Sequence, residues 1–507
     1  MSSAPAVVDR TALPSEVEAL KDIIVDLAAQ LESLKQQVLA LRRAHFGTSS
    51  ERLSGQAELF VEAVSLPLPA VETQTVSYER TRRGRPALPK DLPRIRVDYD
   101  LSEAEKASYD QLQRIGEEVS ETLDYIPAKL QVIEHVRAKY AARGQDGEST
   151  VVTAALPPAP LPKANASANL LAHVLVSKYH DHLPLNRIER IFGRQGVELA
   201  RSTLCDWVLG STELLDVLYA ALKAHMLAAP KIHADDTIVA LVEQGRGKSV
   251  QARLWAYLGA GACLNAQGQW IEHPAAVLYE FTDDRRGEHV RRMLAGYSGY
   301  LQADAYSGFD ALYAGGRILE VGCWAHARRK FFDIAQAAPE DSGTLAHQAL
   351  EWIGRLYAIE ATIKERPPDE KRELRQQRAL PLLEQMRSWL ELSLRSLLPK
   401  SPTAGAIGYA LSHWQALTRY LEAGILDIDN NACERTIRPI AVGRKNWLFV
   451  GSQRGGRAAA IAFSLIQTCK LHGVEPYAYL ADVLRRLPTH PANRVAELLP
   501  FNWKPAA

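Results

Sequence analysis

The stretch KIHADDTIVALVEQ, residues 231–244, decides the fold, because strand-like segments begin here in a chain that is helical just before it. Two more segments of the same kind follow, SVQARLWAYLGA at 249–260 and AAVLYEFTDD at 275–284, and turns separate them. Runs of β-branched, aromatic and other apolar residues bounded by turns are typical of strands. We therefore expect three consecutive strands, the first of which carries Asp235 and Asp236.

Helices and strands alternate after these three strands. In chain order we expect a helix at 285–297, a strand at 299–308, a helix at 309–316, a strand at 317–326 and a helix at 327–338. Three strands followed by this alternation is the order of a ribonuclease H-like mixed sheet, in which the first and fourth strands are neighbours.

A helical stretch interrupts this sheet domain. Residues 340–424 are charged and carry no strand signals, so we expect a helical insertion there. The sheet domain resumes at ILDIDNNACERTIRPI, residues 425–440, where a turn leads into a helix. The ribonuclease H-like catalytic domain is thus predicted over 229–339 and 425–445, and a C-terminal hairpin and helices over 446–507.

Three carboxylates are expected to meet in this domain. Asp235 lies on or at the end of the first strand, Asp304 at the end of the fourth, and Glu434 at the start of the helix that follows. Carboxylates this close repel one another unless cations neutralise them, and two Mg²⁺ ions about 3.5–4 Å apart, or Mn²⁺ in their place, would do so. One ion would activate an attacking oxygen and the other would stabilise the leaving oxygen of a phosphodiester displacement.

Neighbours of these carboxylates are open to more than one interpretation. Consecutive side chains of a strand point to opposite faces, so only one of Asp235 and Asp236 is expected to line the site. His233 shares the face of Asp235, and it either contacts a metal or phosphate or is a packed, hydrogen-bonded histidine. Cys323 and His326 have Cys-x-x-His spacing, but no second pair accompanies them, so no zinc site is expected there.

A heptad pattern occupies residues 15–43, after an N-terminus of residues 1–14 that is expected to be disordered. β-Branched residues at most of the first apolar positions and leucine at the second favour a parallel two-stranded coiled coil. A single amphipathic helix docked on its own chain is the alternative. The residues that would form the dimer contact are Leu20, Ile24, Leu27, Leu31, Leu34, Val38 and Leu41.

Residues 44–93 are expected to be a basic, partly disordered linker. Within it, Arg83 and Arg85 belong to an Arg-Gly-Arg-Pro sequence, which has the form of a hook for a narrow A·T minor groove. A solvated basic linker is the alternative. Residues 94–155 are expected to form a small β-rich module, with a strand-like segment over 132–140.

Residues 156–228 are expected to be helical after a proline-rich linker. Two of these helices are joined through glycines, and Arg201, Ser202 and Thr203 open the second helix. The second helix of a helix-turn-helix reads the major groove of DNA in this way. A helical hairpin that only packs against the rest of the chain is the alternative.

Further basic residues lie near the expected carboxylate site. Either they contact DNA phosphates or they form a solvated face. The first group, at the passage from the fifth strand into a helix, contains His326, Arg328, Arg329 and Lys330, and the second, after Glu434, contains Arg438, Arg444 and Lys445.

Length, charge and cysteine content limit which classes of protein this chain can belong to. A chain of 507 residues is too long for one ordinary domain. Its net charge of +1 does not argue against a nucleic-acid partner, because local clustering of charge decides such binding. The chain has no apolar run long enough to span a membrane and no signal peptide, and its 5 cysteines are scattered, so we expect a cytoplasmic location.

Longer motifs add a family resemblance. HADDT, LQADAYSGFD, CWAHARRKFFD and IDNNACERTIRPIAVGRKNWLFVGS together resemble the catalytic region of the TnpC-type transposases of the insertion sequence 66 family. LRRAHFGTSSERL, IGEEVSETLDYIP and LLAHVLVSKYHDHLPLNRIERIF resemble upstream regions of the same family. The resemblance covers the chain from about residue 15 to about residue 487.

This resemblance implies a DDE transposase, named after its two aspartates and one glutamate. The family's triad falls on Asp235, Asp304 and Glu434, which selects Asp235 over Asp236. It implies excision and insertion of a mobile element by attack of a 3′-hydroxyl on double-stranded DNA in the bacterial nucleoid. Two element ends must be held together, so at least a homodimer is expected, and the family implies companion proteins encoded by the same element.

One departure from the family concerns zinc. The family's small zinc-binding module has cysteine and histidine pairs where this chain reads LSEAEKASYDQLQRIGEEVSE and KYAARGQDGES, with no cysteine. His135 is the histidine nearby, and structural zinc needs four such ligands. We therefore expect a degenerate module that folds without zinc.

Two other functions compete with an active transposase. A DNA-binding regulator derived from a transposase would keep the fold and lose catalysis, but retention of all three acidic residues favours the enzyme. A ribonuclease H-like nuclease in repair or recombination would not need the coiled coil over 15–43 and the basic linker over 44–93.

Overall fold

The computed structural model describes residues 130–137, 139–143, 149–153, 156, 158–162, 164–242, 249–337 and 343–505. The chain divides into one unit made of Met1–Leu66 and Lys139–Ala507 and a second unit made of Pro67–Ala138. The predicted disordered N-terminus, coiled coil and basic linker lie outside the described residues, and so do Arg83 and Arg85.

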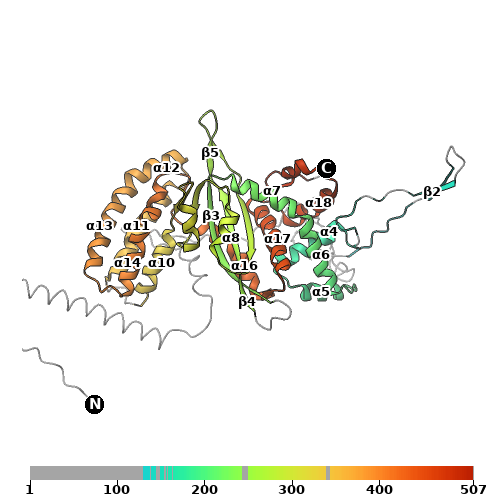
Figure 1. Ribbon diagram of the computed structural model, residues 1–507, viewed down its shortest axis with the longest axis horizontal. Coiled ribbons are helices and arrows are strands. Elements are labelled where there is room, and N and C mark those ends of the chain that lie inside the picture. The colour runs from blue at the N-terminus through green and yellow to red at the C-terminus, as the bar shows by residue number, and fades with distance from the viewer. Residues whose placement is uncertain are drawn as a thin grey trace, which may run out of the picture. The chain divides into compact units, whose positions relative to one another are not determined.

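A mixed sheet lies at the centre of the Lys139–Ala507 segment (Figure 1). Its strands are β3 (Lys231–Leu241), β4 (Val250–Ala260), β7 (Ala276–Thr282), β8 (Gly299–Gln302), β9 (Ile318–Val321) and the short β10 (Phe449–Val450). The spatial order is β7-β4-β3-β8-β9, and β10 pairs with β3. β4 is antiparallel to both β3 and β7, whereas β8 and β10 run parallel to β3, and β9 runs parallel to β8. The predicted mixed sheet, with its first and fourth strands as neighbours, is confirmed.

One face of this sheet is covered by helices from the C-terminal half of the chain. Asp235 pairs with Ala256, and Ala256 pairs with Tyr279, so these three residues point to the same face. The Tyr279 hydroxyl donates to a carbonyl of α16 (Asn431–Trp447) at 2.5 Å, and its ring contacts α17 (Gln453–Leu471). The helix that begins just before Glu434 therefore packs on the face that carries Asp235.

The opposite face carries Asp236 and Trp255, which pair with each other one residue further along β3. The Trp255 ring contacts Phe309 of η2 (Ser307–Phe309) edge-on, with ring centroids 6.2 Å apart. Next to η2 lie α8 (Gly287–Met293) and α9 (Asp310–Tyr313). Asp235 and Asp236 thus face different layers of the fold.

Four helices precede the sheet: α4 (Ala168–Tyr179), α5 (Leu185–Arg194), α6 (Arg201–Leu214) and α7 (Asp216–Leu227). Gly196, between α5 and α6, has a φ of 81°, a left-handed conformation that glycine adopts without a Cβ penalty. α7 packs on β4 and β7, and α4 packs on α17 and on α18 (Pro476–Arg486). The predicted helical region, and the start of its second helix at Arg201, are confirmed.

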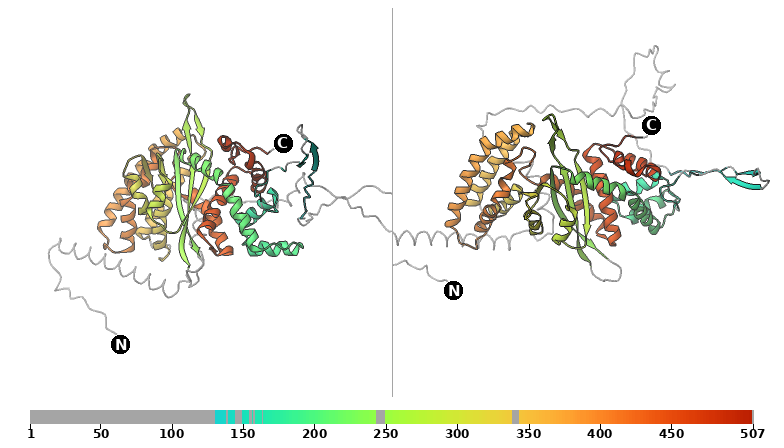
Figure 2. Two further views of the ribbon diagram at one scale, coloured as in Figure 1. Left: turned by 45° about the vertical axis from the view of Figure 1, so that its right-hand side comes forward. Right: turned by 45° about the horizontal axis from the view of Figure 1, so that its top comes forward.

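The helical insertion has a hydrophobic core of its own and lies beyond the β9 edge of the sheet (Figure 2). α10 (Trp324–Ala335) leads into it, and it contains α11 (Leu345–Ile363), α12 (Pro368–Leu374), the π-helical turn η4 (Arg375–Ala379), α13 (Leu380–Arg395), α14 (Pro402–Ser412), α15 (Trp414–Thr418) and η5 (Arg419–Leu421). No strand occurs between residues 343 and 424, so the predicted helical character of this part of the insertion is confirmed.

The small hairpin between β4 and β7 is not predicted by the sequence. β5 (Ala262–Leu264) pairs antiparallel with β6 (Trp270–Glu272) around Gly268, whose φ is 74°. The Trp270 indole donates to the Asp369 carboxylate at 2.8 Å, so the hairpin contacts α12 of the insertion.

Two sequence-based expectations about strands need correction. The C-terminal hairpin is wrong, because α16 continues to Trp447, and β10 joins the sheet parallel to β3 instead of folding back on a neighbour. Trp447 packs against the main core, which favours continuing the helix to this residue. The strand expected over 132–140 begins only at Lys139, where β1 (Lys139–Arg143) pairs with β2 (Ser149–Thr153).

The chain ends in two short helical turns after α18. These are η6 (Leu487–Thr489) and η7 (Ala492–Leu498), and Leu498 joins the main core. Among the residues that the structure describes, no helix combines the length and the apolar character that a membrane span requires.

Candidate active site

Three acidic side chains converge where β3, β8 and α16 meet. Asp235 lies on β3, Asp304 follows two residues after the end of β8, and Glu434 lies in the first turn of α16. His233 pairs with Gln302 across β3 and β8, so each aspartate lies two residues beyond a paired position on neighbouring parallel strands. This register explains how residues far apart in sequence reach one place.

The pKa of the Asp235 carboxyl depends on burial and on the charges around it. Burial raises the pKa of its carboxyl well above the usual range, and the negative charges of Glu434 and Asp304 raise it further. One hydrogen bond, from the backbone N–H of Asp236 at 2.7 Å, opposes this rise. Desolvation and like charge both disfavour ionisation of a carboxyl group, so this cluster attracts protons or cations.

Glu434 is buried, with 9% of its surface exposed. Burial raises the pKa of its carboxyl, while the nearby positive charges of His326 and Arg329 oppose that rise. Glu434 Oε1 lies 3.7 Å from His326 Nδ1, beyond hydrogen-bond distance, and within the described structure neither buried atom has a hydrogen-bond partner. Buried polar atoms normally have partners, so this pair faces a place where a ligand would supply them.

Asp236 has opposite surroundings. Arg253 Nη1 lies 2.9 Å from Asp236 Oδ2, and Arg285 Nη2 lies 2.8 Å from Asp236 Oδ1. The Arg285 guanidinium also lies 3.6 Å from Asp304 Oδ2 and stacks over the Tyr306 ring at 4.0 Å. Asp236 is therefore neutralised by two arginines, and Arg285 connects this pair to the edge of the carboxylate cluster.

Neither Arg253 nor Arg285 is among the predicted site residues. The signal for them lies in the strand register, because Arg253 is two residues before Trp255, the partner of Asp236 on β4. Alternation along β4 places Arg253 and Trp255 on the same face. Arg285 comes just after β7, where the sequence does not indicate which way a loop side chain turns.

The turn before α16 is attached to the strand that carries Asp235. Asn430, which is fully buried, donates from Nδ2 to the Ala234 carbonyl at 3.0 Å. His233 contacts Asn430 Oδ1 through Nδ1 at 3.0 Å and Asp427 Oδ2 through Nε2 at 3.0 Å. His233 is thus a buried, hydrogen-bonded histidine, which is one of the two roles considered for it.

Asp427 completes this network. Lys231 Nζ lies 2.5 Å from Asp427 Oδ2. Burial alone would raise the pKa of the Asp427 carboxyl, but Lys231 and His233 lower it below the usual range. Neither Asp427 nor Asn430 is a predicted site residue, although both stand in the DIDNN stretch, residues 427–431, just before Glu434.

The predicted DNA-binding residues that the structure describes lie at the start of α6, on α10 and on α16. Arg201 and Ser202 are exposed and Thr203 is half-buried at the start of α6, where Arg201 lies 3.6 Å from a Glu189 carboxylate oxygen. Lys445 and Arg438 are exposed on α16.

Other members of that set contact the protein itself. Arg444 donates to the Thr237 hydroxyl at 3.1 Å and to the Ile238 carbonyl at 2.7 Å, which attaches α16 to β3. Lys330 lies over the Tyr409 ring at 4.4 Å and Arg328 over the Phe332 ring at 5.5 Å. Within this set, His326 and Arg329 are the residues whose charges act on Glu434.

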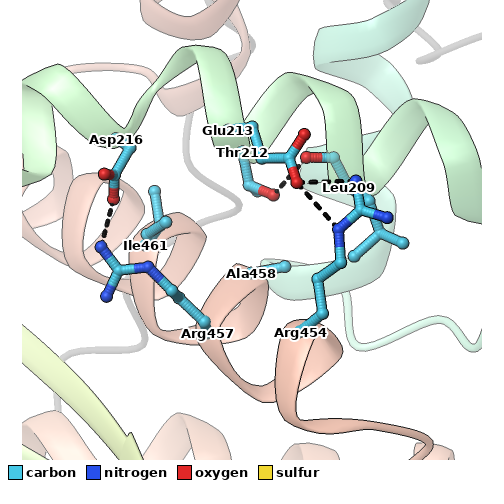
Figure 3. Close-up of a pocket in the computed structure, with 8 residues that line it drawn as sticks. All are labelled: Leu209, Thr212, Glu213, Asp216, Arg454, Arg457, Ala458 and Ile461. Atoms are coloured by element: carbon cyan, nitrogen blue, oxygen red, sulfur yellow. Dashed lines mark hydrogen bonds and ion pairs between the residues drawn. The ribbon is translucent and has the colours of Figure 1, made fainter.

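A groove lies between α6, α7 and α17 (Figure 3). Two ion pairs cross it: Arg454 lies 2.6 Å from Glu213, and Arg457 lies 2.5 Å from Asp216. All four side chains are about half exposed, and exposed pairs of this kind contribute little to stability. The Arg454 guanidinium is thus engaged by an acidic residue of α6.

Comparison with known families shows to which family the chain belongs. The profile of the transposase IS66 family matches residues 163–458, which include all three converging carboxylates.

The chain belongs to the IS66 family of transposases.

Other family profiles match the rest of the chain. They are the IS66 C-terminal element over residues 464–501, a profile described as transposase C of IS166 homeodomain over 33–97, and the zinc-finger binding domain of transposase IS66 over 108–143. The expected family membership is therefore confirmed from the N-terminal region to the C-terminal helices.

The zinc-finger match corrects one expectation. The absence of zinc was expected from a count of cysteine and histidine ligands, whereas the segment as a whole matches the zinc-finger binding domain of this family and points to zinc. A ligand count within one short segment does not capture what the rest of that segment shares with the family. The expectation of no zinc is therefore wrong.

Three relatives of this transposase come from Sinorhizobium fredii (strain NBRC 101917 / NGR234). The uncharacterized protein y4hP is 36% identical over 96% of this chain and 90% of its own length. The uncharacterized proteins y4qI and y4jD are 35% and 33% identical, over 98% and 97% of this chain and 93% and 97% of their own lengths. The similarity thus extends over nearly the whole of each protein.

Proposed function

We propose that this transposase binds the ends of a mobile element and cleaves and joins DNA by a DDE mechanism, with Asp235, Asp304 and Glu434 as its catalytic residues. The observation that carries the proposal is the convergence of these three carboxylates, from two parallel strands and one helix, within a chain of a transposase family. The sheet that holds them has the strand order expected of a ribonuclease H-like domain, and we propose that fold class for it.

The three side chains fit a pair of divalent cations. Each offers carboxylate oxygens, which are the ligands that Mg²⁺ and Mn²⁺ prefer. Burial and mutual repulsion raise the pKa of Asp235, and Glu434 Oε1 lacks a partner within the described structure, so the cluster has uncompensated charge and an unused ligand atom. When bound, Mg²⁺ would lower the pKa of an attacking water or hydroxyl and neutralise charge on the leaving oxygen.

The chain's own residues would hold the DNA backbone around this cluster. His326, half-buried beside Glu434, presents an unpartnered Nδ1 atom towards the carboxylate cluster and is suited to contact a phosphate oxygen. Arg329 adds positive charge on the same side. On the other side, Arg285 reaches Asp304. These groups would orient the phosphodiester, which is most of what a protein contributes to phosphoryl transfer.

DNA recognition is proposed for more distant parts of the chain. The start of α6 exposes Arg201 and Ser202, as the recognition helix of a helix-turn-helix does. Arg83 and Arg85 remain proposed minor-groove ligands, and the heptad residues from Leu20 to Leu41 remain a proposed dimer contact. Pairing of two element ends in the bacterial nucleoid, with companion proteins of the same element, follows from the same proposal.

The test is strand transfer with labelled duplexes that carry the sequences flanking the coding region, in Mg²⁺ or Mn²⁺. Glu434→Gln should abolish cleavage and joining while leaving DNA binding intact, because the amide keeps the shape of the side chain and loses its charge. Glu497→Gln, an exposed change in η7, is the matched control and should behave as wild type. Activity of Glu434→Gln equal to wild type would remove this proposal.

The same assay separates the alternative function. A DNA-binding regulator that had lost catalysis would bind the labelled ends and cleave neither strand in any divalent metal. Retention of all three acidic residues at one place favours the active enzyme over that regulator.

A further inference from the structure

We propose that Asn430 is a positioning residue that fixes Glu434 relative to Asp235 and Asp304. The proposal rests on the proposed DDE function and deepens it. Asp235 lies on β3 and Asp304 follows two residues after β8, whereas Glu434 comes after the far end of the helical insertion. Something must hold the start of α16 against the two strands.

Asn430 makes that connection with every polar group it has. Its Nδ2 donates to the carbonyl of Ala234, the residue just before Asp235, at 3.0 Å, and its Oδ1 lies 3.0 Å from His233 Nδ1. Its backbone N–H donates to Cys323 Sγ at 3.1 Å, and its carbonyl accepts from the backbone N–H of Glu434 at 3.2 Å. One buried residue therefore joins β3, the start of α10 and the first turn of α16.

The second aspartate is tied to the same turn. Gln302, two residues before Asp304, donates from Nε2 to the carbonyl of Asp427 at 2.6 Å and to the carbonyl of Gly322 at 3.3 Å. Gln302 is fully buried. The turn from Asp427 to Asn430 is therefore hydrogen-bonded to a residue close to each catalytic aspartate.

The insertion holds the turn from its other side. Tyr357 of α11 donates to Asp429 Oδ2 at 2.9 Å, and the buried Arg375 donates to the Leu426 carbonyl at 2.9 Å. Because hydrogen bonds from both the sheet and the helical insertion hold the turn, removing one of these contacts should shift α16 without unfolding it. Asn430 is the anchor that reaches the strand of Asp235 directly.

A hydrogen-bonded group behind a metal ligand typically changes metal affinity or activity by about 10–100-fold. A displacement of about 1 Å in a catalytic group reduces turnover by about 100-fold. We therefore expect Asn430→Ala to weaken binding of Mn²⁺ to the full-length protein by about 10-fold and to lower kcat for DNA cleavage by about 100-fold. The KM for the DNA end should change by no more than about twofold, since Asn430 is fully buried.

Asn431→Ala is the matched control. Asn431 adjoins Asn430 in the sequence, but its side-chain Nδ2 donates to Asp429 Oδ2 within the turn itself. This variant should keep the Mn²⁺ affinity, kcat and KM of the wild type within about threefold. The double variant Asn430→Ala, His233→Ala should be no slower than Asn430→Ala alone by more than about threefold, because the two side chains act as one unit.

The decisive measurements are Mn²⁺ binding by isothermal titration calorimetry and cleavage kinetics, both on protein shown to be folded by circular dichroism. If Asn430→Ala does not fold, His233→Ala takes its place in the same two measurements. Wild-type Mn²⁺ affinity and kcat in the folded variant would overturn the proposal, as would a loss of the same size in Asn431→Ala. A wild-type protein that binds Mn²⁺ but does not cleave DNA would remove the proposed function, and the positioning role would then stand or fall on whether Asn430→Ala binds Mn²⁺ about 10-fold more weakly.

Discussion

Asp235 and Asp236 are adjacent on β3, yet Asp235 faces Glu434 and Asp304 while Asp236 binds the guanidinium groups of Arg253 and Arg285. One carboxylate is held among negative charges and the next among positive charges. Strand alternation produces this separation, because consecutive side chains point to opposite faces of the sheet. The two residues should therefore fail in different ways when they are changed.

Asp235→Asn should lower strand transfer by about 1000-fold, because it removes a group that acts on charge developing in the reaction. It should not destabilise the metal-free protein, since the change removes a buried charge that is repelled by its neighbours. Strand-transfer rates and thermal unfolding of the metal-free protein check both parts. A variant that loses activity only because it unfolds would contradict this expectation.

Asp236→Asn should instead reduce the free energy of unfolding, by about 3 kcal/mol, because it removes the counter-charge of Arg253 and the nearer of the two carboxylates beside Arg285. Urea unfolding monitored by circular dichroism measures this loss. Any residual folded fraction should still bind divalent cations, because Asp236 is not one of the converging carboxylates. Unchanged stability would show that Arg253 and Arg285 find other partners or solvent.

The pH dependence of stability follows from the raised pKa values of Asp235 and Glu434. A carboxyl whose pKa is higher in the folded than in the unfolded protein stabilises the fold below its unfolded pKa, about 4, and this stabilisation is lost as the pH rises through the folded pKa. The metal-free wild type should therefore lose Tm relative to Asp235→Asn as the pH rises above about 4.

Addition of Mg²⁺ should reverse this loss, because the cation replaces the protons that leave the cluster. The rise in Tm on adding Mg²⁺ should be larger at pH 8 than at pH 5, and it should be smaller in Asp235→Asn at both values. Differential scanning fluorimetry of wild type and variant measures all four shifts. Equal shifts in the two proteins would mean that Mg²⁺ stabilises the chain elsewhere.

Arg375 should be essential to the stability of the helical insertion. Its guanidinium is 2% exposed, binds the Glu360 carboxylate at 2.7 Å and donates to the carbonyls of Tyr420, Ala423 and Leu426. Arg375→Met should cost about 3–5 kcal/mol, because a partly buried carboxylate and three carbonyls lose their partner.

Hydrogen exchange should locate this loss in residues 420–426 and in the helices beside them. Arg387→Met is the control, because Arg387 and Glu391 form an exposed pair on α13 whose loss should cost less than about 1 kcal/mol. If Arg375→Met and Arg387→Met reduce the free energy of unfolding equally, burial does not make the Arg375 contacts stronger than an exposed ion pair.

Removal of residues 1–42 should weaken pairing of two element ends more than binding of one end. The reason is the heptad repeat, which favours a two-stranded coiled coil between protomers. Gel-shift titration with one labelled end and then with two distinguishes the effects. An equal loss of single-end and paired-end binding would show that this segment does not link protomers.

Much of this architecture is predictable from local patterns. The apolar runs around Asp235 and before Asp304 predict neighbouring strands, and Asn430-Asn431 predicts the start of the helix that carries Glu434; the structure contains these elements. Periodicity and turn residues are local properties, and the neighbouring positions of β3 and β8 then follow from chain topology.

The surroundings of the carboxylates are less predictable. The partners of Asp236 and Asn430 come from residues distant in sequence, and their side-chain directions depend on how the layers pack. The end of α16 at Trp447, where a hairpin is expected, depends in the same way on the core against which Trp447 rests. Such contacts are tertiary, and no short stretch of sequence encodes them.

The position of the helical insertion between Asp304 and Glu434 also orders events during protein synthesis. A ribosome that adds about 5–20 residues per second delivers the two aspartates seconds before the glutamate. α17, which packs on β7, emerges later still. A polypeptide that terminates within the insertion therefore lacks both Glu434 and the helix that covers the sheet, so the proposed DNA-cleaving activity would arise only after both have been synthesised.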